Sequence, residues 1–302
     1  MEKKSHIIVG LDPVHERLPS CLKPQPAKSL KDICKSIIEF NSRLIDAVYD
    51  IVPAIKPQVA FYERYGIEGM KVFLETVKYG RGKGLIVIED AKRNDIGSTA
   101  EAYSDGHIGR VSINNKKCPV FDLDAITVNP YLGSDGIKPF LNDLVNYGKG
   151  IFILVKTSNP SSKEIQDLQI VIRTKRKRLY EILAEQVNIW GMRTIGEYGY
   201  SSVGAVVGAT YPKEAKVLRK LMPKAYFLVP GFGTQGGKGS DIVSCFNKDG
   251  LGAIIAASRS INYAYQNKRY RDKDYAEAAR EAVIRMNKEI NDELRRNKLL
   301  IW

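Results

Sequence analysis

Residues 84–95 read Gly-Leu-Ile-Val-Ile-Glu-Asp-Ala-Lys-Arg-Asn-Asp, an apolar run followed directly by clustered charges. The apolar part has the length and the β-branched content of a strand that is buried on both faces. Side chains on a strand alternate between its faces, so we expect Asp90 and Lys92 to point the same way. Charges at the end of a buried strand are costly to desolvate. This stretch therefore predicts a strand that ends in a functional site, and the alternative is a solvated turn with a local ion pair.

The same layout recurs along the chain and decides the fold class. Eight short, mostly apolar runs have the character of strands: 6–11, 53–56, 84–89, 125–129, 150–155, 203–208, 225–229 and 252–256. Amphipathic helical stretches lie between most of them, among them 29–51 and 212–222, and another, 275–294, follows the last run. Eight strand–helix units in 302 residues favour an α/β fold, a parallel (β/α)8 TIM barrel. No Pro- or Ser-rich linker divides the chain, so we expect a single domain over residues 1–302.

Composition excludes several classes of protein. Hydrophobic residues make up 44% of the chain and charged residues 27%, which is ordinary for a globular protein with a sizeable core. No apolar run is long enough to span a bilayer and the first residues lack a secretory signal, so we expect a cytoplasmic protein without a membrane partner. The four cysteines lie far apart and predict reduced thiols. Neither they nor the three histidines have the spacing of metal ligands, so no metal site is expected.

The formal net charge of +13 permits nucleic-acid binding. The most concentrated basic run consists of Arg173, Lys175, Arg176, Lys177 and Arg178, and it opens a stretch with helical periodicity. We interpret this run as a solvated helix N-terminus. No aromatic residues interleave with basic ones, and no zinc-finger or helix-turn-helix pattern occurs, so we expect no nucleic-acid partner. A positive field can equally steer a small phosphorylated substrate.

In a barrel of this kind the site forms at the C-terminal ends of the strands. The residues found there are Asp12, Lys56, Asp90, Lys92, Thr157, Ser158, the loop around Gln235, Ser258 and Arg259. Two lysines and several carboxylates at one rim can shift one another's pKa values. Arg259 follows the eighth strand and the glycine-rich segment 230–240 follows the seventh, where such barrels commonly bind phosphate. The alternative for Arg259 is a surface ion pair, and for the glycine-rich segment a flexible connection.

Over nearly its whole length the chain resembles the orotidine 5′-monophosphate decarboxylase family. The most diagnostic motif is Asp-x-Lys-x-x-Asp at Asp90, Lys92 and Asp95. Further support comes from Gly10-Leu11-Asp12-Pro13, Lys56, Thr157-Ser158-Asn159-Pro160, Pro230-Gly231 before Gln235, and Ser258-Arg259-Ser260-Ile261. The length and the extended connection 157–175 after the fifth strand resemble the longer subgroup of bacterial and parasite enzymes. The resemblance implies decarboxylation of orotidine 5′-monophosphate to UMP and carbon dioxide in pyrimidine biosynthesis, without metal or cofactor.

The resemblance also implies a role for each matching residue. Lys56, Asp90, Lys92 and Asp95 would form a charged catalytic array, in which Lys92 donates the proton to the C6 carbanion. The substrate-binding residues would be Asp12, Gln58, Thr99, Thr157, Ser158, Pro230, Gln235, Ser258 and Arg259. Of these, Asp12 would contact the ribose together with Lys56, Ser158 would recognise the pyrimidine, and Gln235 and Arg259 would hold the phosphate. Asp95 and Thr99 would reach into the partner subunit's site, which implies a homodimer with shared active sites. At Gln58 the resemblance also allows asparagine, and both side chains can contact the ribose or the ring.

Three alternatives remain open from the residues alone. The 3-keto-hexulose-6-phosphate decarboxylases and synthases share the Asp-x-Lys-x-x-Asp motif but use magnesium, are shorter, and carry an acidic residue in place of Lys56. A Schiff-base aldolase would use Lys156 at the end of the fifth strand. A non-catalytic, polyanion-binding barrel would bind RNA with steep salt dependence.

Overall fold

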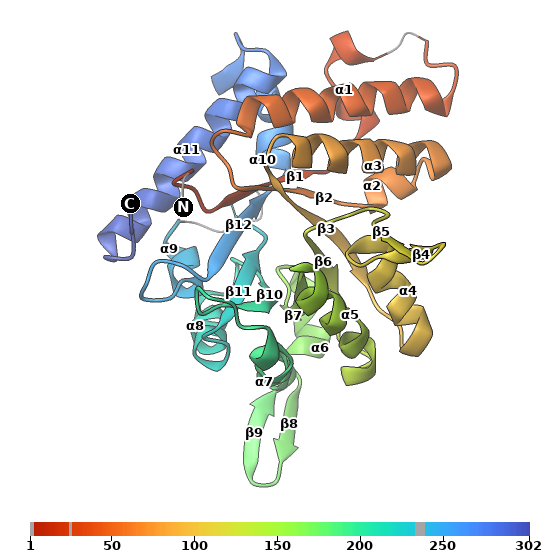
Figure 1. Cartoon of the computed structure of the whole chain (residues 1–302). Helices are drawn as coiled ribbons and strands as arrows, with labels where there is room; N and C mark the ends of the chain where they lie inside the picture. Colours follow the sequence, from red (N-terminus) through yellow and green to blue (C-terminus); the bar gives the residue numbers. More distant parts are fainter. Residues whose placement is uncertain (1–2, 24–25, 233–238) are drawn as a thin grey trace. The chain divides into compact units, whose positions relative to one another are not determined.

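The computed structural model describes residues 3–23, 26–232 and 239–302 (Figure 1). By their internal contacts the residues fall into two compact units. The first comprises Met1–Ala91 and Ala256–Asn291, and the second comprises Lys92–Ile255 and Asp292–Trp302. The single domain that the sequence predicts therefore stays a prediction.

Eight parallel strands form a closed barrel in the order β1-β12-β11-β10-β7-β6-β3-β2. Their bounds are β1 (Ile7–Leu11), β2 (Ala54–Pro57), β3 (Ile86–Arg93), β6 (Ala125–Val128), β7 (Gly150–Lys156), β10 (Ser201–Val207), β11 (Ala225–Val229) and β12 (Ala253–Ala257). Each overlaps one of the eight predicted runs, so the predicted (β/α)8 barrel is confirmed. The main difference is at β3, which continues to Arg93 and so contains both Asp90 and Lys92.

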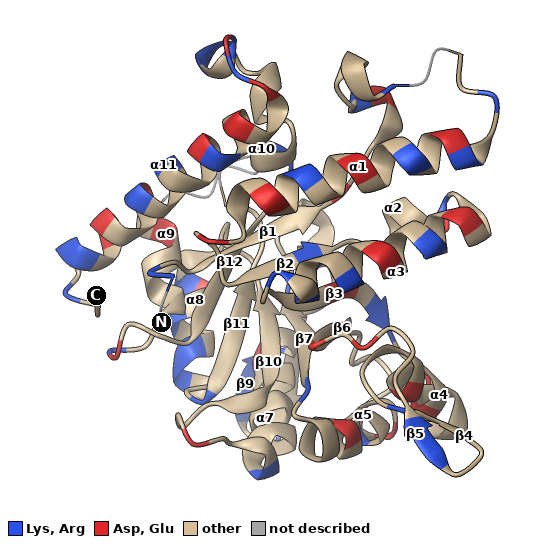
Figure 2. Cartoon of the chain, turned by 45° about the horizontal axis from the view of Figure 1, so that its top comes forward, with Lys and Arg blue, Asp and Glu red and all other residues tan. Residues whose placement is uncertain are grey.

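The first unit contains the helices that follow β1, β2 and β12 along the chain, the last of them as far as Asn291. They are α1 (Leu30–Val48), α2 (Ala60–Glu63), α3 (Gly66–Gly82), α10 (Arg259–Asn262) and α11 (Tyr275–Arg296), with 3-10 turns η1 (His15–Arg17), η2 (Ser20–Leu22), η6 (Ala264–Gln266) and η7 (Lys268–Tyr270). Helix α1 begins where predicted because the Ser29 hydroxyl accepts a hydrogen bond from the Asp32 amide and caps the first turn. Helices α1 and α3 pack side by side (Figure 1). Phe40 of α1 and Phe73 of α3 are both buried, Phe40 stacked on Tyr275 and Phe73 edge-on to Tyr62. Charged residues lie along these helices, whereas the barrel strands carry few of them (Figure 2).

The second unit contains the helices that follow β3 to β11. They are α4 (Gly97–His107), α5 (Ser134–Tyr147), α6 (Lys163–Gln166), α7 (Leu179–Gly191), α8 (Pro212–Leu221) and α9 (Gly239–Ile242), with 3-10 turns η3 (Pro160–Ser162), η4 (Met192–Thr194) and η5 (Val243–Cys245). In α8, the buried Arg219 donates hydrogen bonds to the carbonyl groups of Ala225 and Gly252, 2.8 Å and 2.7 Å away. Burial lowers the pKa of Arg219 to about 10, so the side chain is charged at neutral pH. It therefore links α8 to the N-terminal ends of β11 and β12.

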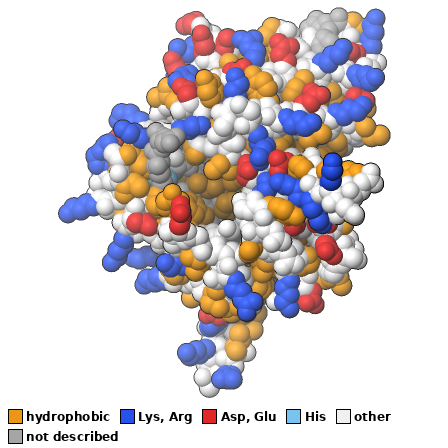
Figure 3. All heavy atoms as spheres, in the orientation of Figure 1, with side chains coloured by type: hydrophobic (Ala, Val, Ile, Leu, Met, Phe, Trp, Pro, Cys, Tyr) orange, Lys and Arg blue, Asp and Glu red, His pale blue; other side chains and the backbone are white. Residues whose placement is uncertain are grey.

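Two hairpins outside the barrel were not predicted. They are β4 (Val111–Ile113) with β5 (Lys116–Cys118), and β8 (Gln169–Ile172) with β9 (Lys175–Arg178). The interpretation of the basic run as a helix N-terminus is wrong, because residues 175–178 form β9 and helix α7 begins only at Leu179. Each aliphatic residue of β8 faces a cation of β9, and the hairpin carries both kinds of side chain on its surface (Figure 3). The connection 157–175 is likewise not a plain loop, since it contains η3, α6 and β8.

Other expectations from composition have clear outcomes. All four cysteines are free, as predicted, and two of them, Cys34 and Cys245, are buried. His6 and His107 are buried, and the His107 ring stacks on Phe121. None of the described helices combines the length and the apolar character that crossing a bilayer requires.

Candidate functional site

In the first unit, Lys56 at the end of β2 forms an ion pair with Asp90 on β3. The Lys56 Nζ and Asp90 Oδ2 atoms are 2.9 Å apart, and only 5% of Lys56 is exposed. Burial by itself would lower the pKa of Lys56, but the negative charges of Asp90 and Asp12 raise it above its usual value of 10.5. The ammonium of Lys56 is therefore charged at neutral pH, and it holds the Asp90 carboxylate at the strand end.

The ends of β1 and β12 are held close together by a glycine. A Cβ atom on Gly10 would lie 1.9 Å from the Ser258 hydroxyl oxygen, so only glycine lets this strand approach Ser258 without a shift. The Tyr263 hydroxyl donates to the Asp12 carbonyl oxygen over 3.0 Å and accepts from the Val14 amide over 2.8 Å. These contacts fix the backbone of Asp12.

Arg259 is the first residue of α10 and its side chain is exposed. Among the residues that the structure describes, none forms an ion pair with it, so the surface ion pair considered from the sequence does not occur there. Gln58 pairs with Asp90 through the backbone, and its side-chain oxygen accepts from the Ala60 amide over 3.4 Å. The first unit thus brings Lys56, Gln58 and Asp90 together.

In the second unit, Lys92 has an unusual backbone. Its φ angle of 53° lies in the left-handed region, which costs free energy for a residue with a Cβ atom. The Lys92 amide donates to the Thr127 hydroxyl on β6 over 2.9 Å, which supports this conformation. Because a regular strand has negative φ throughout, the direction of Lys92 relative to Asp90 does not follow from strand alternation, and that expectation stays a prediction.

Asp95 and Thr99 lie at the start of α4. The Asp95 carboxylate accepts from the Ile96 amide over 2.8 Å, and Thr99 is exposed in the first turn. Ile96 between them is 53% exposed. A Cβ atom on Gly136 of α5 would lie 2.3 Å from the Asn94 side-chain oxygen, so α5 packs tightly against the turn before α4.

Thr157 and Ser158 directly follow β7. A Cβ atom on Gly208 would lie 2.8 Å from the Ser158 Cα atom, so the backbone after β10 passes very close to Ser158. The Thr210 hydroxyl donates to the Ser158 carbonyl oxygen over 3.3 Å. The Pro230 carbonyl oxygen accepts from the Ala209 amide over 2.9 Å. Ser158, after β7, and Pro230, after β11, thus both contact the segment 208–210 that follows β10. Gln235 lies outside the described residues.

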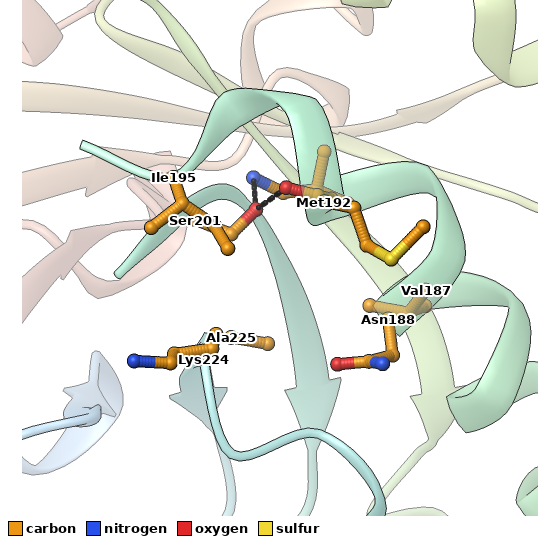
Figure 4. Close-up of a pocket in the computed structure, with 9 residues that line it drawn as sticks. Val187, Asn188, Met192, Ile195, Ser201, Lys224 and Ala225 are labelled. Carbon is orange, nitrogen blue, oxygen red and sulfur yellow. Dashed lines mark hydrogen bonds between the residues drawn. The ribbon is translucent and has the colours of Figure 1, made fainter. Parts of the chain in front are cut away.

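Two hollows in the second unit do not coincide with these strand ends. A cavity of about 20 Å³, enough for one water molecule, lies beside Ser201 and Ala225 at the N-terminal ends of β10 and β11 (Figure 4). There the Ser201 hydroxyl donates to the Gly191 carbonyl oxygen over 3.1 Å and accepts from the Val203 amide over 2.9 Å (Figure 4). A groove of about 1140 Å³ runs along α4, α5 and the end of α7, and Ile96 lines it. In the described part of the chain, no three His, Cys, Asp or Glu side chains are grouped so as to hold a metal ion.

Comparison with known proteins places the chain in a family. The model of the Orotidine 5'-phosphate decarboxylase / HUMPS family matches residues 5–274. The chain belongs to this family. The resemblance seen in the sequence is thereby confirmed.

Relatives within the family match the chain over almost all of its length. An orotidine 5′-phosphate decarboxylase of Caldicellulosiruptor bescii is 44% identical over 294 residues, which are 96% of this chain and 94% of that protein. The structure of Leishmania donovani OMP decarboxylase is similar with a TM-score of 0.72 and 30% identity, and the match covers 96% of this chain and 94% of that one. The structure of Leishmania donovani UMP synthase is similar with a TM-score of 0.74 and 31% identity over 97% of this chain. The chain spans about half of that protein, 54% of its length.

The sequence did not reveal which residues hold Asp12, Ser158 and Lys156 in place. Tyr263 beside Asp12, Gly208 beside Ser158 and Asp167 beside Lys156 were not singled out. For Asp167 a signal was present, because a buried lysine at a strand end requires a nearby carboxylate. For Tyr263 and Gly208 there was none, since their contacts join residues far apart in the chain.

Proposed function

We propose that the protein decarboxylates orotidine 5′-monophosphate to UMP and carbon dioxide in pyrimidine biosynthesis. The observation that carries this proposal is the 44% identity, over almost the full length of both chains, to a relative named for that activity. Lys56 supports it further, because the magnesium-dependent sugar-phosphate enzymes are expected to carry an acidic residue on β2. The buried Lys56–Asp90 ion pair gives this lysine a defined partner.

The chemistry requires electrostatic stabilisation. Loss of carbon dioxide from an sp2 ring carbon leaves a carbanion that the ring's π system does not delocalise, so positive charge must be provided beside it. We assign this task to Lys92, which then donates the proton to C6. The Asp90 carboxylate would repel the substrate carboxylate, and this repulsion disappears as neutral carbon dioxide leaves.

The geometry supports a pre-organised arrangement of these groups. Lys56 fixes the Asp90 carboxylate through the 2.9 Å ion pair and is kept charged by Asp90 and Asp12. The left-handed backbone of Lys92 is the kind of local strain that accumulates at active sites. Groups fixed before the substrate binds stabilise the transition state without reorganisation.

Substrate binding is assigned to residues at the other strand ends. Arg259 has an exposed guanidinium, which suits bidentate contact with phosphate oxygens. Ser158 is assigned to the pyrimidine ring and Asp12 to the ribose. The remaining substrate-binding residues are Gln58, Thr99, Thr157, Pro230, Gln235 and Ser258.

The functional unit that we propose is a homodimer with shared active sites, to which Asp95 and Thr99 contribute from the partner subunit. Ile96 lines the groove beside α4 together with three further exposed apolar residues, Val145, Ile189 and Met192, and such a grouped set supports an interface there. Mixing inactive Lys92→Ala with inactive Asp95→Ala should restore activity in about a quarter of the sites after random subunit exchange. No recovery after verified exchange would contradict shared sites. The free cysteines support a reducing compartment such as the cytoplasm.

The activity is tested by the loss of orotidine 5′-monophosphate absorbance with purified, EDTA-treated protein. Lys92→Ala should lower kcat by at least about 10³-fold and leave UMP binding measurable, because the phosphate and ribose contacts lie on other residues. Lys216→Ala, on the exposed face of α8, is the matched control and should behave like the wild type. Loss of activity on chelation with recovery in magnesium would move the assignment to the sugar-phosphate branch of the family.

A further inference from the structure

Lys156 is the last residue of β7 and is completely buried, with 0% of its surface exposed. Its Nζ atom lies 2.7 Å from Asp167 Oδ1 and donates to the Ser162 hydroxyl over 3.2 Å. It also lies 4.5 Å from the centre of the Tyr211 ring. A buried ammonium is tolerated only with such partners. Because Nζ is engaged by these groups and has no exposed surface, no carbonyl substrate reaches it, which argues against the Schiff-base alternative.

The partners of Lys156 lead back to the segment that directly follows it. The Ser162 hydroxyl donates to the Tyr211 hydroxyl oxygen over 3.4 Å, and the Tyr211 hydroxyl donates to the Asn159 carbonyl oxygen over 3.3 Å. A chain of hydrogen bonds therefore runs from the ammonium to the backbone next to Ser158. Hydrogen bonds arranged in such a chain polarise and strengthen one another.

Two further hydrogen bonds hold the start of the same segment, at Thr157. The Thr157 amide donates to the Gln166 side-chain oxygen over 2.9 Å, and the Gln166 side-chain amide donates to the Thr157 hydroxyl over 2.8 Å. Gln166 directly precedes Asp167, so the partner of Thr157 and the partner of Lys156 are adjacent residues. Both contacts therefore tie the connection after β7 back to its first residues and to the end of the strand.

On its other side, Ser158 is confined by the backbone after β10. Gly208 passes so close that a Cβ atom there would lie 2.8 Å from the Ser158 Cα atom. Ser158 is therefore held between this backbone and the segment anchored by Lys156. Its position depends on both.

We propose that Lys156 is a positioning residue for pyrimidine recognition: with Asp167 and Ser162 it fixes residues 157–159, which present Ser158 to the base. The inference rests on the proposed function, which assigns Ser158 to the pyrimidine ring. It predicts a defect in recognition of the base that leaves recognition of the ribose phosphate intact.

The test compares two ligands on the same variants. Lys156→Met keeps the length of the side chain without its charge, and the double variant Lys156→Met/Asp167→Asn removes the unpaired carboxylate as well. For both, we expect the Kd for UMP to rise about fivefold, the scale of one lost hydrogen bond between neutral groups. The Kd for ribose 5-phosphate, which lacks the base, should stay within about twofold of wild type, a difference too small for a lost hydrogen bond. The control is Lys216→Met.

A mutant cycle tests whether Lys156 acts through Ser158. If it does, Lys156→Met in a Ser158→Ala background should weaken UMP binding no further than the larger single change, because the losses of coupled residues do not add. Additive losses, equal losses for both ligands, or a folded double variant with wild-type affinity for UMP would each overturn the inference. Absence of both UMP binding and turnover in the wild type would overturn the proposed function as well, whereas intact turnover with any of those three results overturns the inference alone.

Discussion

A buried lysine near the end of a barrel strand pairs with a partly exposed aspartate in each unit, and the two pairs differ in where the aspartate lies. Lys56 pairs with Asp90, which belongs to the neighbouring strand β3. Lys156 pairs with Asp167, eleven residues further along its own chain segment. A partner on another strand fixes a charge at the rim of the barrel, whereas a partner on the following connection fixes that connection. A strand-end position alone does not distinguish the two roles that we propose for these lysines, whereas the location of the partner does.

The largest effect should come from removing each lysine in turn. Lys56→Met should lower kcat for orotidine 5′-monophosphate by about 10²–10³-fold, the usual cost of losing one pre-organised electrostatic group. Lys156→Met should act mainly on KM and change kcat much less, because it supports binding of the base. Steady-state kinetics of both variants measure this split. A larger loss of kcat for Lys156→Met than for Lys56→Met would reverse the roles assigned to the two pairs.

A smaller effect should separate two glycines beside these regions. Gly208→Ala places a Cβ atom within 2.9 Å of the Ser158 N, Cα and Cβ atoms, which the backbone fixes. Gly10→Ala places one 2.8 Å from the Ser258 Cβ atom and 1.9 Å from its hydroxyl oxygen, and of these two only the hydroxyl can rotate away. Gly208→Ala should therefore lower the free energy of unfolding by about 1–3 kcal/mol, the cost of overpacking, and Gly10→Ala by less. Urea unfolding of both variants gives the two values. Gly208→Ala should also weaken UMP binding, and unchanged affinity would show that the backbone after β10 does not confine Ser158.

The smallest effect concerns pH and the Lys56–Asp90 pair. The pKa of Lys56 is raised in the folded state, so the stability that its charge contributes is fully present below its ordinary value of 10.5. This contribution is lost only as the pH rises through the raised folded-state pKa. The difference in unfolding free energy between wild type and Lys56→Met should therefore stay constant from about pH 6 to 9 and shrink above about pH 11. A difference that already declines between pH 7 and 9 would mean that Asp90 and Asp12 do not hold the ammonium in its charged form.

Much of the fold could be predicted because its signals are local. Continuous apolar runs identified all eight barrel strands, and the amphipathic stripe within 29–51 identified α1. The hairpin β8–β9 could not be predicted in the same way. Its strands are short and exposed, and what defines them is the pairing of aliphatic residues with cations across the hairpin. From the sequence alone, the basic run 173–178 was therefore interpreted as a solvated helix N-terminus.

For the site, the sequence by itself determined which residues stand at the ends of the strands, because the chain order of a (β/α)8 barrel places them there. It thereby identified Lys56, Asp90 and Arg259, and it supplied the motif that shows the family. The tertiary structure alone decided that Lys156 is anchored by Asp167, that Gly10 and Gly208 leave room for Ser258 and Ser158, and that Lys92 has a left-handed backbone. The physical reason is that desolvation, close approach and backbone strain depend on which atoms surround a residue in space, and the neighbours in sequence do not specify those atoms.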